Sequence, residues 1–300
     1  MTLQTNGIII LYKESGITSQ TAVNKIKRLL GTDKAGHTGT LDPLATGVLP
    51  ILVGRGVKAS EYLVTDGKHY GTTLLLGITT DTEDVTGNTL TTSDTIPDEK
   101  EVAAAIESML GDSMQIPPMY SAIKKNGKKL CDLARDGITV EREPRKITIS
   151  EISYEKINER EYKIDVHCSK GTYIRTLCAD IGNKLGVGGT MKTLERLSAG
   201  GYTVADAHTL SEIESMSEEE RAALVLPIES IFKGLDAINL PPFYARLARC
   251  GVEIYLKKIG LTAPVGKRFR LKDGDEFFAL GEVREYEDGL AVKPIKQFLV

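Results

Sequence analysis

The chain has 300 residues, of which 41% are hydrophobic and 26% charged, and its formal net charge is −3. This composition predicts a globular protein with one large domain and room for a small second one, and it excludes the disordered and fibrous classes. Its apolar runs are far shorter than the roughly 20 residues that cross a bilayer, and no signal-peptide pattern opens the chain, so we expect a cytoplasmic protein with no membrane contact.

The first part of the chain predicts two buried strands with a helix between them. The apolar run at 7–12 indicates one strand, and TTLLLG at 72–77 indicates the other. Residues 18–31 favour an amphipathic helix that begins after Thr18 or Ser19 and ends at a glycine. The apolar face of this helix consists of Val23, Ile26 and Leu30.

The middle of the chain predicts two further helices around a half-buried strand. Pro97 opens a surface helix that Gly111 ends, and its apolar stripe consists of Val102, Ile106 and Leu110. The stretch 161–168 alternates as a strand does, and its buried side consists of Tyr162, Ile164 and Val166. A helix follows over 171–186, with Ile174, Leu177, Ile181 and Leu185 facing inward.

The end of the chain has a different pattern. The proline-containing stretch NLPPFYARL at 239–247 indicates a domain boundary, and short strands joined by the turns KDGD and EDG follow it. We therefore expect a large mixed α/β domain over residues 1–237 and a small β-rich domain over 238–300. The tail offers no clustered reactive groups, so the chemistry is expected in the first domain.

The stretch AGHTGTLDPLATGVLP at 35–50 places one aspartate, Asp42, in a glycine-rich loop that is otherwise poor in charge. Glycines permit tight turns, and Pro43 favours an extended Asp42, so this loop can hold a carboxylate rigidly. In the alternative interpretation Asp42 only bonds its own backbone in a turn. Arg175 would lie in the first turn of a helix capped by Thr172, against the helix dipole, so a carboxylate or phosphate is expected beside it.

Other reactive clusters are not evident. The four cysteines form no CxxC pair and the four histidines show no HExxH spacing, so we expect reduced thiols and no metal site. The net charge argues against RNA binding through bulk charge. KKNGKK at 124–129 is the best local basic candidate, although it can also be an ordinary solvated loop.

The loop sequence GHTGTLDPLATGVLP closely resembles the catalytic motif of the bacterial tRNA pseudouridine-55 synthases, the TruB-type family. Further matches follow in the family's order, and several long motifs in order make a chance match very improbable. They are YKESGITS at 12–19, KHYGTTLLLGITTDTEDVTG at 68–87, QIPPMYSAIKKNGKKLCDLARDG at 115–137 and CSKGTYIRTLCADIGNKLG at 168–186. The resemblance implies a pseudouridine synthase fold, a mixed α/β domain around a curved, mainly antiparallel sheet, with a small RNA-binding C-terminal domain of PUA-like kind.

The resemblance also implies a reaction. The T-loop uridine of tRNA, position 55, would be isomerised to pseudouridine by breaking its N1–C1′ bond and joining C5 to C1′, with no cofactor or metal. Asp42 would be the catalytic carboxylate, which attacks the base or the sugar or stabilises charge at C1′. Tyr70 would stack on the base and is a candidate for proton transfer at C5. Arg175 would pair with Asp42.

Substrate-binding roles follow in the same way. His37 matches the histidine that enters the T loop and helps to hold the target nucleotide out of the stack. Tyr173 and Leu194 match positions that line the uridine pocket, while Lys13 and KKNGKK are expected to contact phosphates. The chain departs from the family at Glu14, where proline is common, and at Glu195, where a basic residue is frequent.

Three rival interpretations remain. LDPLATG resembles the stand-alone bacterial form more than the guide-RNA-dependent branch, where LDPKVTG is usual, so we expect tRNA as partner, no guide RNA and a monomer. DPLATG also fits aspartyl-phosphate phosphotransferases, but these need Mg²⁺ held by further acids, which are not evident. A protein that binds and remodels tRNA without catalysis is the third possibility, although such a protein has no need of Asp42.

Overall fold

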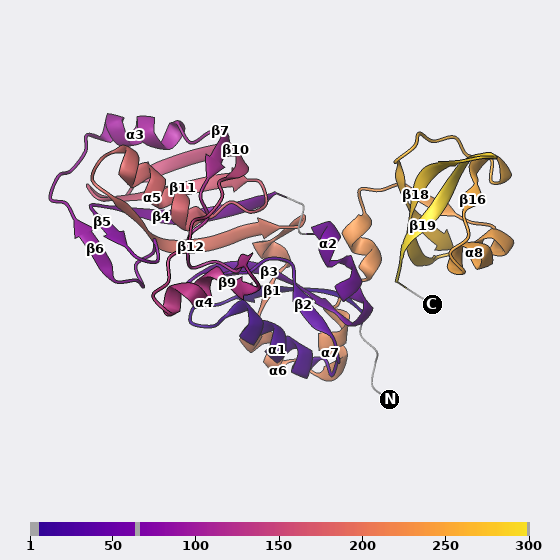
Figure 1. Cartoon of the computed structure of the whole chain (residues 1–300). Helices are drawn as coiled ribbons and strands as arrows, with labels where there is room; N and C mark the ends of the chain where they lie inside the picture. Colours follow the sequence, from indigo (N-terminus) through magenta and orange to yellow (C-terminus); the bar gives the residue numbers. More distant parts are fainter. Residues whose placement is uncertain (1–5, 64–66, 299–300) are drawn as a thin grey trace.

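The computed structural model describes residues 6–63 and 67–298. Figure 1 shows a large unit, which contains the strands up to residue 209, and a small unit at one end of the molecule, which contains the last strands. Within the described residues, no helix has the length and apolar character needed to cross a membrane.

The large unit is built on one ten-stranded sheet. Its main path runs β14 (His208–Thr209), β1 (Gly7–Lys13), β3 (Thr46–Val53), β12 (Gly189–Ala199), β4 (Lys68–Leu76), β11 (Glu161–Cys168), β10 (Arg145–Lys156) and β7 (Gly111–Gln115). Off this path, β2 (Ala35–His37) pairs with β3 and β13 (Tyr202–Thr203) pairs with β12. Among the strand pairs of this sheet in the described part of the chain, β1–β14 and β3–β12 are parallel and the others are antiparallel, so the expected mainly antiparallel sheet is confirmed.

Two groups of helices cover the sheet. The helices α3 (Glu99–Glu107) and α5 (Ile174–Lys184) pack against β4, β10 and β12, whereas α1 (Ser19–Leu29) and α6 (Leu210–Ser215) pack against β1 and β3. Both groups contribute to one continuous hydrophobic core. The remaining helices and short strands of this unit are α2 (Ser60–Leu63), α4 (Leu130–Arg135), α7 (Glu218–Ala223), β5 (Ile78–Thr80), β6 (Thr89–Thr92), β8 (Lys124–Lys125) and β9 (Lys128–Lys129).

The small unit has a five-stranded sheet and its own core, as expected for a β-rich C-terminal domain. Its elements are β15 (Ala237–Asn239), α8 (Pro242–Arg249), β16 (Ile254–Tyr255), β17 (Arg268–Asp273), β18 (Glu276–Tyr286) and β19 (Gly289–Gln297). It contacts the large unit through an aromatic cluster in which Phe232 lies 5.7 Å from Phe277 and 5.5 Å from Phe298, between ring centroids. The division that we expect after residue 237 falls inside β15.

The predicted strands at 7–12, 72–77 and 161–168 and the helix capped by Thr18 are confirmed. Two details differ. The helix α3 ends at Glu107, so Leu110 lies outside it and is 55% exposed. The cap of α5 is Tyr173 rather than Thr172, whose hydroxyl donates to the carbonyl of Ser169 instead.

The proline-containing stretch at 239–247 is also more ordered than a boundary, because most of it forms α8, with proline in the first turn where its missing N–H costs nothing. The stretch KKNGKK is a hairpin of β8 and β9 rather than an irregular loop. Its two central residues, Asn126 and Gly127, have φ of 52° and 82°, which is the backbone that a two-residue turn between strands requires.

Candidate active site

The loop that carries Asp42 connects β2 to β3 and is fixed at several points of its backbone. The Ser19 hydroxyl, at the start of α1, donates to the carbonyl of Leu41 at 2.9 Å and accepts from its N–H at 2.8 Å. The N–H of Gly16 donates to the carbonyl of Pro43 at 2.8 Å, and Ala45 closes a turn onto the Asp42 carbonyl. Asp42 therefore projects from a loop whose backbone is held by hydrogen bonds on both sides of it.

Arg175, the second residue of α5, pairs with Asp42 across the site. Its Nε lies 2.9 Å from Asp42 Oδ2, and its Nη2 lies 3.4 Å from Oδ1, so both carboxylate oxygens are engaged. The guanidinium also donates to the carbonyls of Thr82, at 3.0 Å, and Tyr120, at 2.7 Å. The Arg175 side chain is 6% exposed and that of Asp42 is 31% exposed, so the carboxylate opens toward solvent while its partner does not.

The electrostatics of Asp42 are set by two opposing effects. Burial raises the pKa of the Asp42 carboxyl above its ordinary value, and the nearby Asp84 adds to this increase. The positive charge and hydrogen bond of Arg175 lower the pKa, but they do not cancel the effect of burial. Arg175 therefore keeps the carboxylate in place, while burial leaves the pKa of Asp42 above its ordinary value.

Tyr70 lies on β4, where it is 7% exposed and opposite Arg196 of β12. Burial raises the pKa of the Tyr70 phenol, while the charge and hydrogen bond of Arg196 lower it; the Asp42 charge also acts on this phenol. Tyr70 thus belongs to the same electrostatic environment as Asp42, and it remains a neutral phenol at neutral pH.

Arg196 is the residue at this site that the sequence analysis missed. Its side chain is 1% exposed, and it donates from Nε to the carbonyl of Val48 at 2.7 Å and from Nη2 to the carbonyl of Gly39 at 3.1 Å. It therefore connects β12, β3 and the Asp42 loop beside Tyr70. A signal was present, because alternation in TLERL places Arg196 on the same side as the buried Leu194.

The other expected site residues are distributed around this centre. His37 ends β2 and is half-buried; burial and then the charge of Arg196 lower its pKa, and its Nδ1 has no hydrogen-bond partner among the described residues. Tyr173 caps α5, and the side chain of Gln115 accepts from its N–H at 2.8 Å and donates to its carbonyl at 3.0 Å. Leu194 is 8% exposed.

The expectation that Lys13 contacts phosphate is not supported, because the side chain is fully buried. Its ammonium donates to the carbonyls of Glu14 at 2.9 Å, Ile17 at 2.8 Å and Pro43 at 3.3 Å. Burial lowers the pKa of Lys13 to about 8, against the opposing charge of Asp42. Lys13 therefore holds the Asp42 loop in place through hydrogen bonds to its backbone and to the neighbouring residues 14–17.

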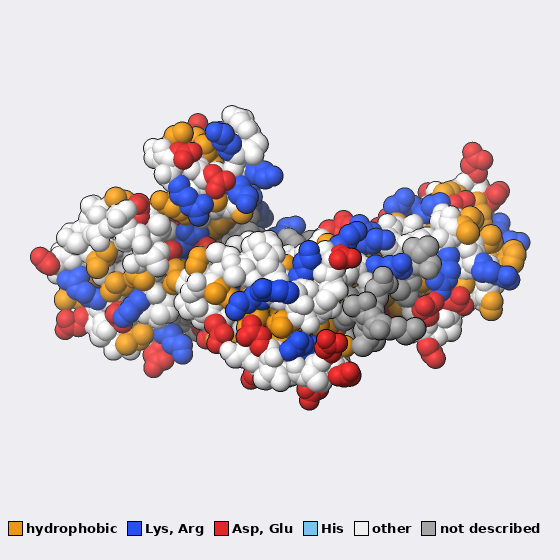
Figure 2. Space-filling view, turned by 90° about the horizontal axis from the view of Figure 1, so that it is seen from below, with side chains coloured by type: hydrophobic (Ala, Val, Ile, Leu, Met, Phe, Trp, Pro, Cys, Tyr) orange, Lys and Arg blue, Asp and Glu red, His pale blue; other side chains and the backbone are white. Residues whose placement is uncertain are grey.

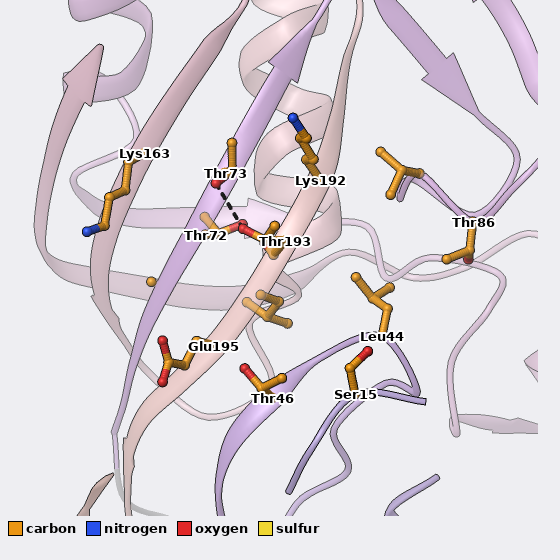
Figure 3. Close-up of a pocket in the computed structure, with 13 residues that line it drawn as sticks. Ser15, Leu44, Thr46, Thr72, Thr73, Thr86, Lys163, Lys192, Thr193 and Glu195 are labelled. Carbon is orange, nitrogen blue, oxygen red and sulfur yellow. Dashed lines mark hydrogen bonds between the residues drawn. The ribbon is translucent and has the colours of Figure 1, made fainter. Parts of the chain in front are cut away.

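A pocket of about 510 Å³ lies beside this loop, between it and strands β4 and β12 (Figure 3). Leu44 and Leu194 supply apolar surface, and Thr73 and Thr193 form a hydrogen bond across the two strands at 2.9 Å. Glu195 also lines the pocket and accepts from the Tyr12 hydroxyl at 2.9 Å. The family departure at Glu195 thus places a carboxylate on the pocket wall.

The basic hairpin of β8 and β9 presents four exposed lysines, Lys124, Lys125, Lys128 and Lys129. Figure 2 shows Lys and Arg side chains gathered on a projecting lobe and around the hollow beside it, despite the negative net charge of the chain. Such local clusters are suited to contacts with phosphates.

A partly exposed carboxylate paired with a buried arginine, beside a buried tyrosine on a mainly antiparallel sheet, agrees with the pseudouridine synthase class, an isomerase, that the sequence motifs imply. Residues 27–174 match the family model described as TruB family pseudouridylate synthase (N terminal domain), and residues 175–233 match that of the tRNA pseudouridylate synthase B C-terminal domain. The chain belongs to the TruB family.

Relatives and solved structures agree with this assignment. The tRNA pseudouridine synthase B of Clostridium tetani is 42% identical over 92% of this chain and 95% of its own length. That of Pectobacterium atrosepticum is 36% identical over 93% and 91%. The crystal structure of a Cbf5-Nop10-Gar1 complex contains a chain that is 25% identical, with a TM-score of 0.71 over 100% of this chain and 86% of that one. The expected fold class and enzyme class are therefore confirmed.

Proposed function

We propose that this chain isomerises the T-loop uridine at position 55 of tRNA to pseudouridine. The observation that carries the proposal is Asp42, held through both carboxylate oxygens by the buried Arg175 while its own side chain stays partly open to solvent. Relatives named tRNA pseudouridine synthase B, each 42% identical over 92% of the chain, support tRNA as the substrate.

The reaction conserves all atoms of the nucleotide. The N1–C1′ bond breaks, the base turns while it is held in the site, and C5 bonds to C1′; C5 then loses its proton and N1 ends with one. Asp42 serves as the carboxylate that attacks the base or the sugar or stabilises positive charge at C1′. Each of these roles needs the ionised form, which Arg175 favours and burial opposes.

Tyr70, Tyr173 and Leu194 are proposed to hold the base. The raised pKa of Tyr70 keeps its phenol protonated, which favours stacking over a role as a base in the resting enzyme. The target nucleotide must leave the folded T loop before its glycosidic bond can meet Asp42, and His37 is proposed to occupy the space that it leaves. The lowered pKa of His37 favours the neutral ring, which stacks at less desolvation cost than the cation.

The lysines of the β8–β9 hairpin are proposed to contact tRNA phosphates, together with the small C-terminal domain over 238–300. We further propose that the chain acts as a monomer, without guide RNA. Sequence identity supports this proposal, because the chain is 42% identical to the tRNA pseudouridine synthase B of Clostridium tetani but 25% identical to the chain in the Cbf5-Nop10-Gar1 complex.

The test is release of tritium from tRNA transcribed with tritium at uridine C5. Wild-type protein, without added metal or cofactor, should release tritium in proportion to tRNA, and replacing the T-loop uridine by cytidine should remove that signal. Asp42→Asn should release none, whereas Asp33→Asn, an exposed acid that precedes the same loop, should match wild type. Tight tRNA binding without release by the wild type would leave a tRNA-binding protein and refute the enzymatic proposal.

A further inference from the structure

A cluster of metal-ligating side chains lies on the sheet face opposite to Tyr70. His69 of β4 and His167 of β11 are direct partners on adjacent antiparallel strands, and Glu151 of β10 is the direct partner of His167. Asp165 precedes His167 by two residues, so it points from the same face of β11. Two imidazoles and two carboxylates therefore share one patch on three neighbouring strands.

The donor atoms of this cluster are already close together. His69 Nε2 lies 2.6 Å from Asp165 Oδ1, and His167 Nε2 lies 3.9 Å from Glu151 Oε2. The two imidazole rings are stacked, with centroids 3.8 Å apart. One donor atom from each of His69, Asp165 and His167 lies within 4.8 Å of the other two.

We propose that His69, Asp165 and His167 form a binding site for a divalent transition-metal ion such as Zn²⁺. Imidazole nitrogens and a carboxylate oxygen are the ligands that zinc takes in proteins, and donors that share a tetrahedral zinc at about 2.1 Å lie about 3.4 Å apart. The present spacing is up to 4.8 Å, so the stacked rings would have to turn on their side-chain bonds for the donors to converge on one ion.

The charges and the exposure around the cluster are compatible with such an ion. Each histidine has a carboxylate within 4 Å, so an ion held at the ring edges by the imidazole nitrogens would lie near two negative charges. The three side chains are partly exposed: 23% for His69, 42% for Asp165 and 41% for His167. An ion can therefore enter, and water can complete its coordination.

Sequence spacing alone does not reveal this site, because His69 is separated by nearly one hundred residues from its two partners. The ion would fasten β4 to β11 at the residue that precedes Tyr70, on the sheet face that also carries Thr73 and Lys163 of the pocket. The proposal is independent of the uridine chemistry, so it does not depend on the outcome of the tritium test.

The experiment is metal binding by the untagged, full-length protein. Zn²⁺ would be titrated in competition with a chromophoric chelator, and Co²⁺ would be added in parallel because its visible spectrum reports tetrahedral ligation and the presence of sulfur. One zinc per chain is expected, with its dissociation constant raised roughly tenfold or more in His69→Gln and again in His167→Gln. Zinc should also raise the unfolding temperature of the wild type, since it binds only the folded strands.

His208→Gln is the matched control, because His208 of β14 also lies beside a carboxylate, Glu212 of α6, but that pair contains no second histidine. It should bind zinc as the wild type does. His167→Gln replaces a residue farther from Tyr70, so it keeps the test valid if His69→Gln fails to fold. Zinc binding that is unaffected in both variants, or a sulfur-to-cobalt absorption band that identifies a cysteine ligand, would overturn the proposal.

Discussion

Arg196 offers the sharpest test of how this site is held together, and Arg196→Met is the informative change. Methionine retains much of the aliphatic volume but leaves the carbonyls of Val48 and Gly39 without the donors that now reach them at 2.7 and 3.1 Å. Each buried acceptor without a partner costs about 1–3 kcal/mol. Removing a buried guanidinium also recovers part of the cost of desolvating it. We therefore expect the free energy of unfolding to fall by about 3 kcal/mol, near the lower end of the summed cost of the two unpaired carbonyls.

The free energy of unfolding, measured with urea, gives the stability, and tritium release gives kcat and KM. Because Gly39 precedes Asp42 by three residues and Tyr70 faces Arg196, kcat should fall by more than KM rises. Arg196→Lys should recover only part of the stability, since one ammonium cannot span both carbonyls as a guanidinium does. Arg284→Met, which removes an exposed ion pair, should change stability by less than about 1 kcal/mol.

If Arg196→Met unfolds within about 1 kcal/mol of the wild type and retains full kcat, the reasoning is refuted, because the carbonyls then find other partners and the loop does not depend on them. A loss of stability with unchanged kcat would retain the structural role but exclude the positioning role.

Three further predictions follow from the titrating groups. Because burial raises the pKa of Asp42 above its unfolded value, the stability that its proton provides is lost as pH rises through that pKa; Asp42→Asn should remove this part of the pH dependence of the unfolding free energy and should also lose tritium release. The pKa of Lys13 is lowered to about 8, so the rate of tritium release should decline as pH rises through this value; a flat pH–rate profile would contradict its role in supporting the Asp42 loop. Because the unfolded chain holds this proton to higher pH than the folded chain does, the free energy of unfolding should rise from about pH 8 upward. Burial raises the pKa of Cys168 to about 11 and of Cys178 to about 12, so iodoacetamide at pH 8 should alkylate the exposed Cys250 before either, as mass spectrometry can show.

Much of the fold follows from local patterns in the sequence. The alternation at 161–168 and the capped amphipathic stretch at 18–31 define a strand and a helix because each pattern records one buried face. The errors of the sequence prediction also arise locally. Leu110 continues the spacing of the α3 stripe, but the helix has already ended at Glu107, so the spacing no longer means a shared face.

The parts of the site that sequence could not specify depend on contacts between distant strands. Lys13 looks like a surface cation in a family motif, yet the loop folds over it and its ammonium becomes an internal donor to three carbonyls. Arg196 and the pair of His69 and His167 acquire their partners only when β12, β4 and β11 come side by side. A residue's type and spacing therefore indicate its chemistry, while the sheet determines what that chemistry contacts.

The positive charges at this site are arranged to support Asp42 without neutralising it fully. Arg175 shares its donors between the carboxylate and the carbonyls of Thr82 and Tyr120, and the Lys13 ammonium donates to three backbone carbonyls of the same region. Carbonyl dipoles fix both cations without taking up a negative charge, so their fields still act on the carboxylate. The result is an Asp42 that is fixed in direction while burial raises the pKa of its carboxyl, which is consistent with the role proposed for it as the carboxylate of the reaction.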